Sequence, residues 1–285
     1  MLKKVYVFCV GLTFICASYK ACASQYEKVI SLGGAVTEVI YALGQEKYLV
    51  GTDISSVHPK EATRLPSVGY YRNLPLEGLI KLNPDIILAS EHAGPKYVLD
   101  KLKSIGVKIE IIDDKPTVRS LSNRINQIAE IFDTPNKGNK LKDKIQNDIA
   151  SNSQPGKHVR ALVLMVHSNQ TLAAGSNTAP DLLLQLSGMQ NILKQKNGYV
   201  RISDESLAAL APDIIILTGS GNPSNTSRPG IQLTPAAQNN NIATVDSLLM
   251  LSIGPRIGES LSILRKLRNT VLLQNSCHKP NKTSA

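Results

Sequence analysis

The chain has 285 residues, with 32 lysines and arginines against 22 acidic residues, and it contains three Phe and nine Tyr but no Trp. At about 100 to 200 residues per domain, this length predicts two domains. A composition of 42% hydrophobic and 19% charged residues is that of a globular protein. It excludes long disordered regions, collagen and coiled coil.

The first 23 residues have the pattern of an export signal. Lysines stand at positions 3 and 4, an apolar run covers residues 5–17, and alanines occupy positions 21 and 23. The apolar run is too short to cross a bilayer, so this order is typical of a cleavable secretory signal peptide. We expect cleavage after Ala23 and no membrane insertion. The residues that precede Cys16 and Cys22 do not fit a lipid-anchor signal.

Cleavage leaves one cysteine, Cys277, and 29 basic against 22 acidic residues, a net charge of +7. No internal disulfide can then form, and the folded chain depends on its hydrophobic core. The charge favours an anionic partner, but it is scattered along the chain. Without a basic stripe or stacking aromatic residues, an exported chain of this kind is not expected to bind nucleic acid.

Short apolar runs alternate with helical periods after the signal. The pattern predicts strands at residues 28–32, 48–51, 85–89 and 107–112, and helices at 36–43, 76–82 and 95–105. This order indicates a parallel sheet covered by helices. Gly33 and Gly34 lie between the first strand and its helix without the spacing of a phosphate-binding loop, so a tight turn is sufficient to explain them.

Residues 114–151 have no strand signal and predict two consecutive helices, separated at 134–136. The second is polar on most faces, as is common for a helix that connects domains in solvent. The αβ pattern then restarts, and it predicts strands at 159–166 and 213–217 and a helix at 179–186.

Two segments of the chain echo each other. Residues 76–88 and 204–216 are identical at seven of 13 positions with a constant offset of 128, which favours repetition of a whole lobe. Pro-Asp before an apolar strand is also common in loops that connect a helix to a strand. The alternative to a repeated lobe is therefore that both segments merely follow the same local helix–turn–strand pattern.

The predicted fold is therefore α/β, with two Rossmann-like lobes, parallel sheets, a single long connecting helix and a ligand cleft between the lobes. The expected boundaries are a signal peptide at 1–23, a first lobe at 24–118, a helical segment at 119–156, a second lobe at 157–275 and a disordered tail at 276–285.

This organisation resembles the helix-linked class of periplasmic substrate-binding proteins, which feed ABC importers for haem, ferric siderophores and cobalamin. The strings at 29–44, 65–72, 173–175 and 254–256 resemble the haem-binding branch. In that branch, a tyrosine directly after Val-Gly ligates the haem iron, and an arginine two residues on supports it. The resemblance therefore implies that Tyr70 is the iron ligand and Arg72 its partner, with Tyr71 as the fallback.

The side-chain chemistry of Tyr70, Tyr71 and Arg72 agrees with that role. Ferric iron suits an anionic phenolate, but a free tyrosine with a pKa of about 10 is neutral outside the cytoplasm. The iron and a nearby guanidinium both favour the anion, although Arg72 can instead bind a propionate. By residue type alone the two tyrosines are more typical of an exposed turn. In extended chain only one of them faces the cleft.

Two histidines follow predicted strands. His167 ends the strand at 159–166, at the sheet edge where α/β proteins place ligand groups. The resemblance implies that His167 reaches the iron from the second lobe, while a strand-end histidine with no ligand role is the alternative. His92 follows the strand at 85–89 and is the weaker candidate. His58, His158 and His278 are expected at the surface.

Glu77 and Glu205 occupy the same position in the two echoed segments. Acidic residues favour helix N-termini in general. The resemblance implies instead that each glutamate docks to arginines of one permease subunit, and duplicate charges suit a two-fold partner.

The sequence thus predicts a monomeric periplasmic protein, not an enzyme, that binds ferric haem as its transported ligand and delivers it to an inner-membrane ABC permease dimer with its ATPase. The same fold carrying a ferric siderophore or cobalamin is the near alternative. The distant alternative is an exported α/β enzyme that uses His167 or His92 as a general base.

Overall fold

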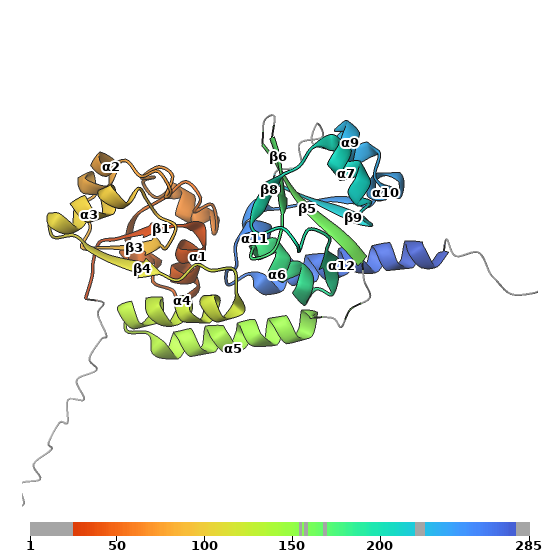
Figure 1. Ribbon diagram of the computed structural model, residues 1–285. Helices are drawn as coiled ribbons and strands as arrows, with labels where there is room; N and C mark the ends of the chain where they lie inside the picture. Colours follow the sequence, from red (N-terminus) through yellow and green to blue (C-terminus); the bar gives the residue numbers. More distant parts are fainter. Residues whose placement is uncertain (1–24, 154–155, 157–158, 168–169, 220–225, 278–285) are drawn as a thin grey trace, which may run out of the picture.

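The structure is a computed structural model that describes residues 25–153, 156, 159–167, 170–219 and 226–277. The expected signal peptide and residues 278–285 of the expected tail lie outside the described residues. Two αβ lobes stand side by side, and a pair of helices runs beneath them (Figure 1). The predicted two-lobed, helix-linked α/β architecture is confirmed.

The first lobe contains a four-stranded parallel sheet in the order β2-β1-β3-β4. Its two central strands are buried along their whole length, because helices cover both faces of the sheet. Each predicted element lies within two residues of its observed bounds. The elements are β1 (Val29–Leu32), α1 (Gly34–Ala42), β2 (Leu49–Thr52), α2 (Leu76–Lys81), β3 (Ile86–Ser90), α3 (Lys96–Ser104) and β4 (Lys108–Ile112).

Two helices form the connection, as predicted. Thr117 caps the N-terminus of helix α4 (Val118–Ile131), because its side-chain hydroxyl accepts a hydrogen bond from the Ser120 backbone N–H. Helix α5 (Pro135–Asn152) is the long connecting helix, and only Gly138 and Ile145 are buried in it. It packs against α4 and against the C-terminal helix α12 (Ile257–Cys277). Lys137 Nζ on α5 also donates to the Leu43 carbonyl at 3.0 Å, so α5 contacts both lobes.

The second lobe contains a six-stranded mixed sheet. Its main path is β10-β9-β5-β6-β8, and β7 pairs with β5. The expectation of a purely parallel sheet fails here because β6 is antiparallel to β5 and β8; two strands separated by only two residues cannot pair in parallel. The strands are β5 (Val159–His167), β6 (Gln170–Ala174), β7 (Met189–Asn191), β8 (Tyr199–Arg201), β9 (Ile214–Thr218) and β10 (Ile242–Val245).

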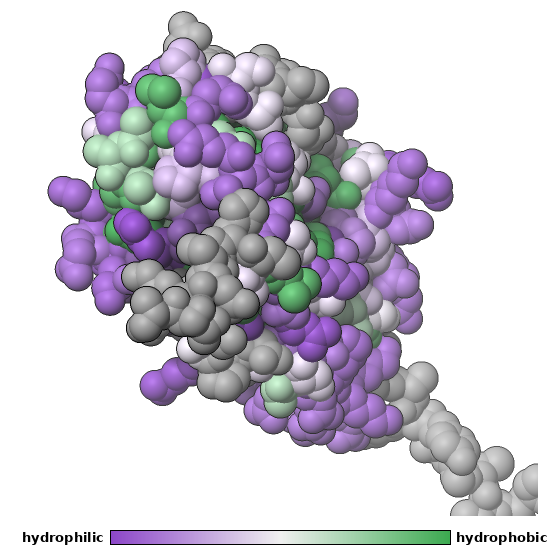
Figure 2. All heavy atoms as spheres, turned by 90° about the vertical axis from the view of Figure 1, so that its right-hand side faces the viewer, coloured by the Kyte–Doolittle hydropathy of each residue, from purple (hydrophilic) through white to green (hydrophobic). Residues whose placement is uncertain are grey.

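The helices of the second lobe are mostly short. They are α6 (Ala179–Leu186), α7 (Asp204–Leu210), α9 (Pro229–Gln232), α10 (Pro235–Gln238) and α11 (Ser247–Leu251). Helix α12 ends at Cys277, two residues into the segment expected as a tail. Among the described residues, no helix is long and apolar enough to span a bilayer. Figure 2 shows a largely hydrophilic face, on which apolar residues form small separate groups.

The echoed segments occupy equivalent places in the two lobes. Helix α2 and strand β3 in the first lobe correspond to helix α7 and strand β9 in the second lobe, and the starts of the matching elements are 128 residues apart. Asn83 and Ala211, one residue before each proline, both have positive φ values, 45° and 44°. Asp85 and Asp213 each accept a backbone N–H from the start of the neighbouring strand. The repeat is therefore structural, and the Pro-Asp pair ties each helix–strand unit to its sheet.

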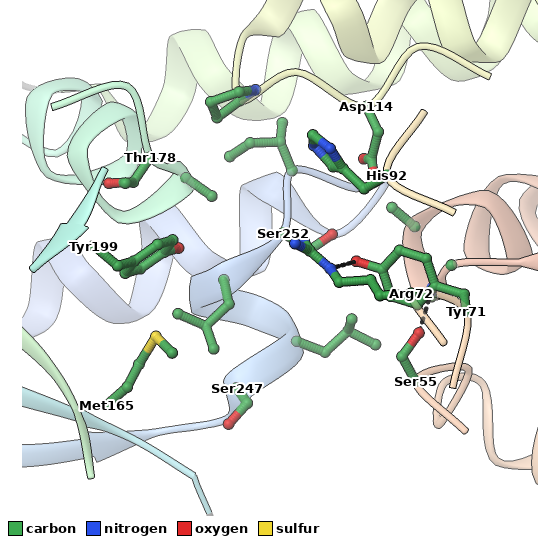
Figure 3. A pocket seen from close by; sticks show the side chains of 18 of the residues that line it. Ser55, Tyr71, Arg72, His92, Asp114, Met165, Thr178, Tyr199, Ser247 and Ser252 are labelled. Carbon is green, nitrogen blue, oxygen red and sulfur yellow. Dashed lines mark hydrogen bonds between the residues drawn. The ribbon is translucent and has the colours of Figure 1, made fainter. Parts of the chain in front are cut away.

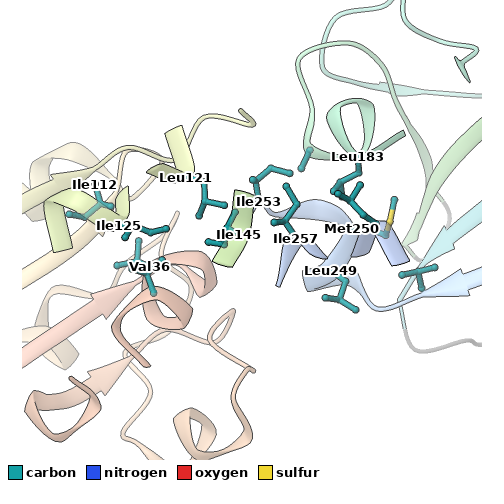
Figure 4. Packing of buried hydrophobic residues seen from close by; sticks show 14 of the residues in the cluster. Val36, Ile112, Leu121, Ile125, Ile145, Leu183, Leu249, Met250, Ile253 and Ile257 are labelled. Atoms are coloured by element: carbon teal, nitrogen blue, oxygen red, sulfur yellow. The ribbon is translucent and has the colours of Figure 1, made fainter. Parts of the chain in front are cut away.

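One hydrophobic cluster continues from lobe to lobe. Leu121, Ile125 and Ile145 from the connecting helices and Leu183 and Met250 from the second lobe all belong to it. Figure 4 shows Ile253, just before α12, and Ile257, the first residue of α12, lying between these two groups. Because interiors are close-packed and resist shear, this shared core restricts how far the lobes can move apart.

Buried polar contacts join the lobes at the same place. Glu38 on α1 is almost completely buried and forms an ion pair with Arg256, whose Nη2 lies 2.6 Å from Oε1. Burial raises the pKa of Glu38, and Arg256 opposes that rise. A Cβ atom at Gly254 would lie 2.9 Å from the other carboxylate oxygen, so glycine there permits the close approach of the two lobes.

We predict that Arg256→Ala lowers the free energy of unfolding by about 3 kcal/mol near neutral pH, because it leaves the buried Glu38 carboxylate without its partner. With Arg256 gone, burial and the charge of Asp246 raise the Glu38 pKa and only His58 opposes them, so the folded-state pKa rises further above the unfolded value. The loss of stability should then shrink as pH falls through that raised pKa. Urea unfolding between about pH 7 and pH 5 measures this.

Arg119→Ala, an exposed change on α4, is the control and should have little effect. Adding Glu38→Gln to Arg256→Ala should remove the pH dependence. A stability loss that is the same at both pH values would contradict the proposed energetics of the ion pair.

Candidate functional site

A cavity of about 610 Å³ lies between the lobes, within the range of roughly 300 to 1,000 Å³ for small-molecule sites. The predicted interlobe cleft is therefore present. The lining residues from the first lobe are Gly33, Gly34, Ala35, Ser55, Val57, Tyr70, Tyr71, Arg72, His92, Asp114 and Pro116. Those from the second lobe are Met165, Asn177, Thr178, Ala179, Tyr199, Ser247, Leu248, Leu251, Ser252 and Ile253.

The turn between β1 and α1 forms part of the cavity wall. Gly33 has a φ of 110°, a conformation that favours glycine. Its N–H donates to Asp53 Oδ1 at 2.9 Å, and the Gly34 N–H donates to Ser55 Oγ at 3.0 Å. Both donors already have protein partners. The predicted tight turn between the first strand and its helix is present.

Tyr70 and Tyr71 both line the cavity, so the expectation that only one of them faces the cleft is wrong. That expectation assumed extended chain. Residues 70–73 instead form a turn, closed by a hydrogen bond of 2.8 Å from the Asn73 N–H to the Tyr70 carbonyl. In such a turn, neighbouring side chains need not alternate between opposite faces.

Arg72 bonds the second tyrosine of the pair. Its Nε donates to Tyr71 Oη at 3.0 Å (Figure 3), and its guanidinium carbon lies 5.3 Å from the Tyr71 ring centre. The Tyr70 and Tyr71 rings meet edge to face, with centres 5.2 Å apart. Burial raises the pKa of Tyr71, and the hydrogen bond and charge of Arg72 act against that rise. Arg72 thus favours a phenolate at Tyr71.

The loops after β3 and β4 bring a histidine and a carboxylate to the cavity. Asp114 Oδ2 accepts a hydrogen bond of 2.7 Å from the Ser90 hydroxyl, and Asp114 Oδ1 pairs with Arg124 at 2.6 Å. The His92 backbone N–H donates to Ser90 Oγ. The sequence analysis did not single out Asp114. His92, which it gave as the weaker histidine candidate, does line the cavity.

The second lobe contributes mainly apolar and aromatic groups. Met165, near the end of the predicted apolar strand at 159–166, is half-buried and lines the cavity. Tyr199 is a site residue that the sequence analysis missed; its position directly after a glycine in a chain poor in aromatic residues was the available signal. Burial of its ring in the wall raises the pKa of Tyr199 to about 12, although 40% of the residue stays accessible.

His167 is the last residue of β5, where its backbone pairs with Gln170. Its side chain lies outside the described part of the structure, so its role stays a prediction. Within the described residues, no group of three or more His, Cys, Asp or Glu side chains is arranged to hold a metal ion.

Glu77 and Glu205 are exposed in the first turns of α2 and α7. Neither lines the cavity. Hydrogen bonds from its own backbone N–H and from the Ser203 hydroxyl lower the pKa of Glu205, so this carboxylate is ionised at neutral pH. Their matching places in the two lobes agree with the echoed segments.

The chain belongs to the periplasmic binding protein family, whose pattern it matches over residues 29–249. A periplasmic haem-binding protein of Pseudomonas aeruginosa is 31% identical, with a TM-score of 0.79 over 84% of this chain and 91% of that one. The haem-binding protein HutB of Vibrio cholerae is 33% identical, with a TM-score of 0.76 over 85% and 98%.

Other relatives of the chain are named for a different ligand. A vitamin B12-binding protein of Vibrio parahaemolyticus is 27% identical over 219 residues, which cover 75% of this chain and 78% of the relative. Family and fold therefore define a substrate-binding protein, while its ligand depends on the chemistry of the cavity.

We predict that Arg72→Gln raises the pKa of Tyr71, because burial then acts without the opposing hydrogen bond and positive charge. Titration followed by NMR of ¹³Cζ-labelled tyrosine measures the change, and Tyr71→Phe assigns the signal. Arg64→Gln, at an exposed position outside the cavity, should leave that pKa unchanged. An unaltered Tyr71 titration in Arg72→Gln would show that the contact has no electrostatic effect.

Proposed function

We propose that this protein acts in the periplasm, where it captures ferric haem in its interlobe cavity and delivers it to an inner-membrane ABC importer. The observation that carries the proposal is the wall formed by Tyr70, Tyr71 and Arg72, in which two phenols and a guanidinium meet at the edge of a cavity. Anionic oxygen is a suitable ligand for ferric iron, and the iron itself and a neighbouring guanidinium both favour the anion.

Tyr70 is the proposed iron ligand. It is 44% exposed and lines the cavity, and among the described residues its hydroxyl has no hydrogen-bond partner. Tyr71 differs, because its hydroxyl is held by Arg72. We propose that Tyr70 coordinates the iron, while the Tyr71–Arg72 pair lies beside it and supplies positive charge. Tyr71 remains the fallback ligand, and Arg72 can also bind a propionate.

Two relatives named for haem, at 31% and 33% identity over most of the chain, support this ligand. The vitamin B12-binding relative at 27% supports cobalamin as the second candidate. A corrin or a ferric siderophore does not require a phenolate next to a guanidinium. The paired phenols therefore favour haem.

We predict that Tyr70→Ala weakens haemin binding by about 100-fold or more, because even an outer-shell partner of a metal ligand is worth about 10- to 100-fold. Tyr71→Ala should have a smaller effect. Titration of the mature protein with haemin, followed by visible absorption, measures both. A phenolate-to-iron charge-transfer band should be present in the wild type and absent in Tyr70→Ala.

Tyr97→Ala is the matched control, since Tyr97 on α3 is 70% exposed and does not line the cavity. His167→Ala, titrated in parallel, tests the proposed second-lobe ligand. Equal affinities of Tyr70→Ala and the wild type would end the assignment of Tyr70. A wild type that binds cyanocobalamin tightly and haemin weakly would favour the second candidate.

Glu77 and Glu205 are the proposed docking residues for the permease dimer. They are exposed, lie in the first turns of equivalent helices, and are separated by the offset that relates the lobes. A partner with two-fold symmetry presents the same surface twice, which suits one glutamate on each lobe. The docking proposal rests on this matched placement together with the resemblance to the transporter class.

We predict that Glu77→Arg combined with Glu205→Arg leaves haemin affinity unchanged and blocks haem delivery, because like charges then face each other in the complex. The measurement is binding-protein-stimulated ATPase activity of the reconstituted importer. The control is Glu61→Arg with Glu130→Arg, two exposed acidic residues elsewhere on the chain. Normal stimulation by the Glu77→Arg, Glu205→Arg variant would contradict the docking proposal and show that both glutamates are ordinary acidic residues at helix starts.

A further inference from the structure

Tyr199 lies in the wall of the cavity opposite the tyrosine–arginine pair. In Figure 3 it stands with Met165 and Thr178 on the side of the second lobe, while Tyr71 and Arg72 lie on the far side. Arg72 and Tyr71 both act electrostatically on the Tyr199 hydroxyl, so the two walls are close enough to interact across the cavity. A flat ligand between the lobes would therefore have aromatic side chains on both sides.

The strand that carries Tyr199 is held firmly at the sheet edge. β8 pairs with β6 in antiparallel register, with Tyr199 opposite Ala174. The Gly175 N–H donates to the Gly198 carbonyl at 2.8 Å. A Cβ atom at Gly175 would overlap the Lys196 carbonyl oxygen. Glycine at 175 is thus needed for the loop before β8 to close, and this loop places Tyr199 in the wall.

Further hydrogen bonds fix the same loop. The Ser176 N–H donates to the Lys196 carbonyl at 2.7 Å, the Gly198 N–H donates to the Ser176 carbonyl at 2.9 Å, and the Asn177 amide donates to Asn197 Oδ1 at 2.9 Å. The backbone that precedes Tyr199 is therefore set before any ligand arrives. A ring presented on such a backbone loses little freedom on binding, which favours affinity.

We propose that Tyr199 lays its ring against the porphyrin face that is turned toward the second lobe, and that it holds the ligand by aromatic contact and not through the iron. This inference rests on the proposed function and deepens it by assigning the second-lobe contact. It also assigns separate tasks to the tyrosines, with Tyr70 as the metal ligand and Tyr199 as the surface for the macrocycle.

The environment of Tyr199 differs from that of Tyr70, the proposed iron ligand. Its raised pKa keeps the phenol protonated at neutral pH, and the Nε of Arg72 is engaged with Tyr71. A neutral ring with an accessible surface is suited to stacking, because offset and edge-to-face aromatic contacts need no ionisation. Met165 beside it offers a polarisable thioether to the same ligand face.

The test compares haemin with iron-free protoporphyrin IX, because aromatic contact acts on the macrocycle whether or not iron is present. Titration of the mature protein with each porphyrin, followed by absorption and fluorescence, gives the affinities. Tyr199→Ala should weaken binding of both by similar factors, about 2- to 10-fold. Tyr199→Phe should bind both as the wild type does. Tyr97→Ala is the control for loss of an exposed tyrosine ring.

Tyr70→Ala provides the opposite pattern, since it should weaken haemin far more than protoporphyrin IX. If wild type binds haemin and Tyr199→Ala binds both porphyrins unchanged, the stacking proposal is wrong and the proposed function stands. If Tyr199→Phe weakens haemin alone, Tyr199 is an iron ligand, and the proposal is overturned. If wild type binds neither porphyrin, the proposed function itself fails.

Discussion

The buried guanidinium of Arg124 determines how the two lobes meet. A charge with no solvent contact must find hydrogen-bonding partners inside the protein. Arg124 donates to the Asp113 carbonyl, to Asp114 Oδ1 and to the Ile253 carbonyl, at 2.6 to 2.8 Å. Asp114 and Ile253 belong to different lobes, and both line the cavity. One side chain on the connecting helix α4 therefore bonds to both walls of the binding site.

The Glu38–Arg256 ion pair and the shared hydrophobic core act in the same region. Together with Arg124 they make the junction of the lobes part of the protein interior and not a free hinge. A site built on such a junction is largely formed before the ligand binds, so less conformational entropy is lost on binding. This suits a carrier that must hold its ligand and then present the same surface to a transporter.

The cavity concentrates the scarce aromatic residues of the chain. Three tyrosines, Tyr70, Tyr71 and Tyr199, line it, and each has a different environment. Tyr70 has an exposed ring, Tyr71 is bonded to Arg72, and Tyr199 is set into the opposite wall with a raised pKa. Under the proposed function, one residue type would provide a metal ligand, a charge-coupled neighbour and a stacking surface.

The sequence by itself determined the elements whose signals are local. Buried strands such as β3 and β9 are short apolar runs after Pro-Asp, and their bounds follow within a residue from the pattern. The echoed segments 76–88 and 204–216 predicted the two lobes, and the string around Tyr70 and Arg72 predicted one wall of the cavity. Strand β8 was not predicted, because an edge strand of three residues is too short to show a detectable periodicity.

Only the tertiary structure decided which groups from distant segments meet. Arg124 and Ile253 are 129 residues apart in the chain, and Glu38 and Arg256 are 218 apart, so no local pattern relates them. The turn at 70–73 brings both tyrosines to the cavity, and the close approach at Gly175 places Tyr199 in the opposite wall. These outcomes depend on packing between lobes, which brings together side chains that a linear pattern leaves unrelated.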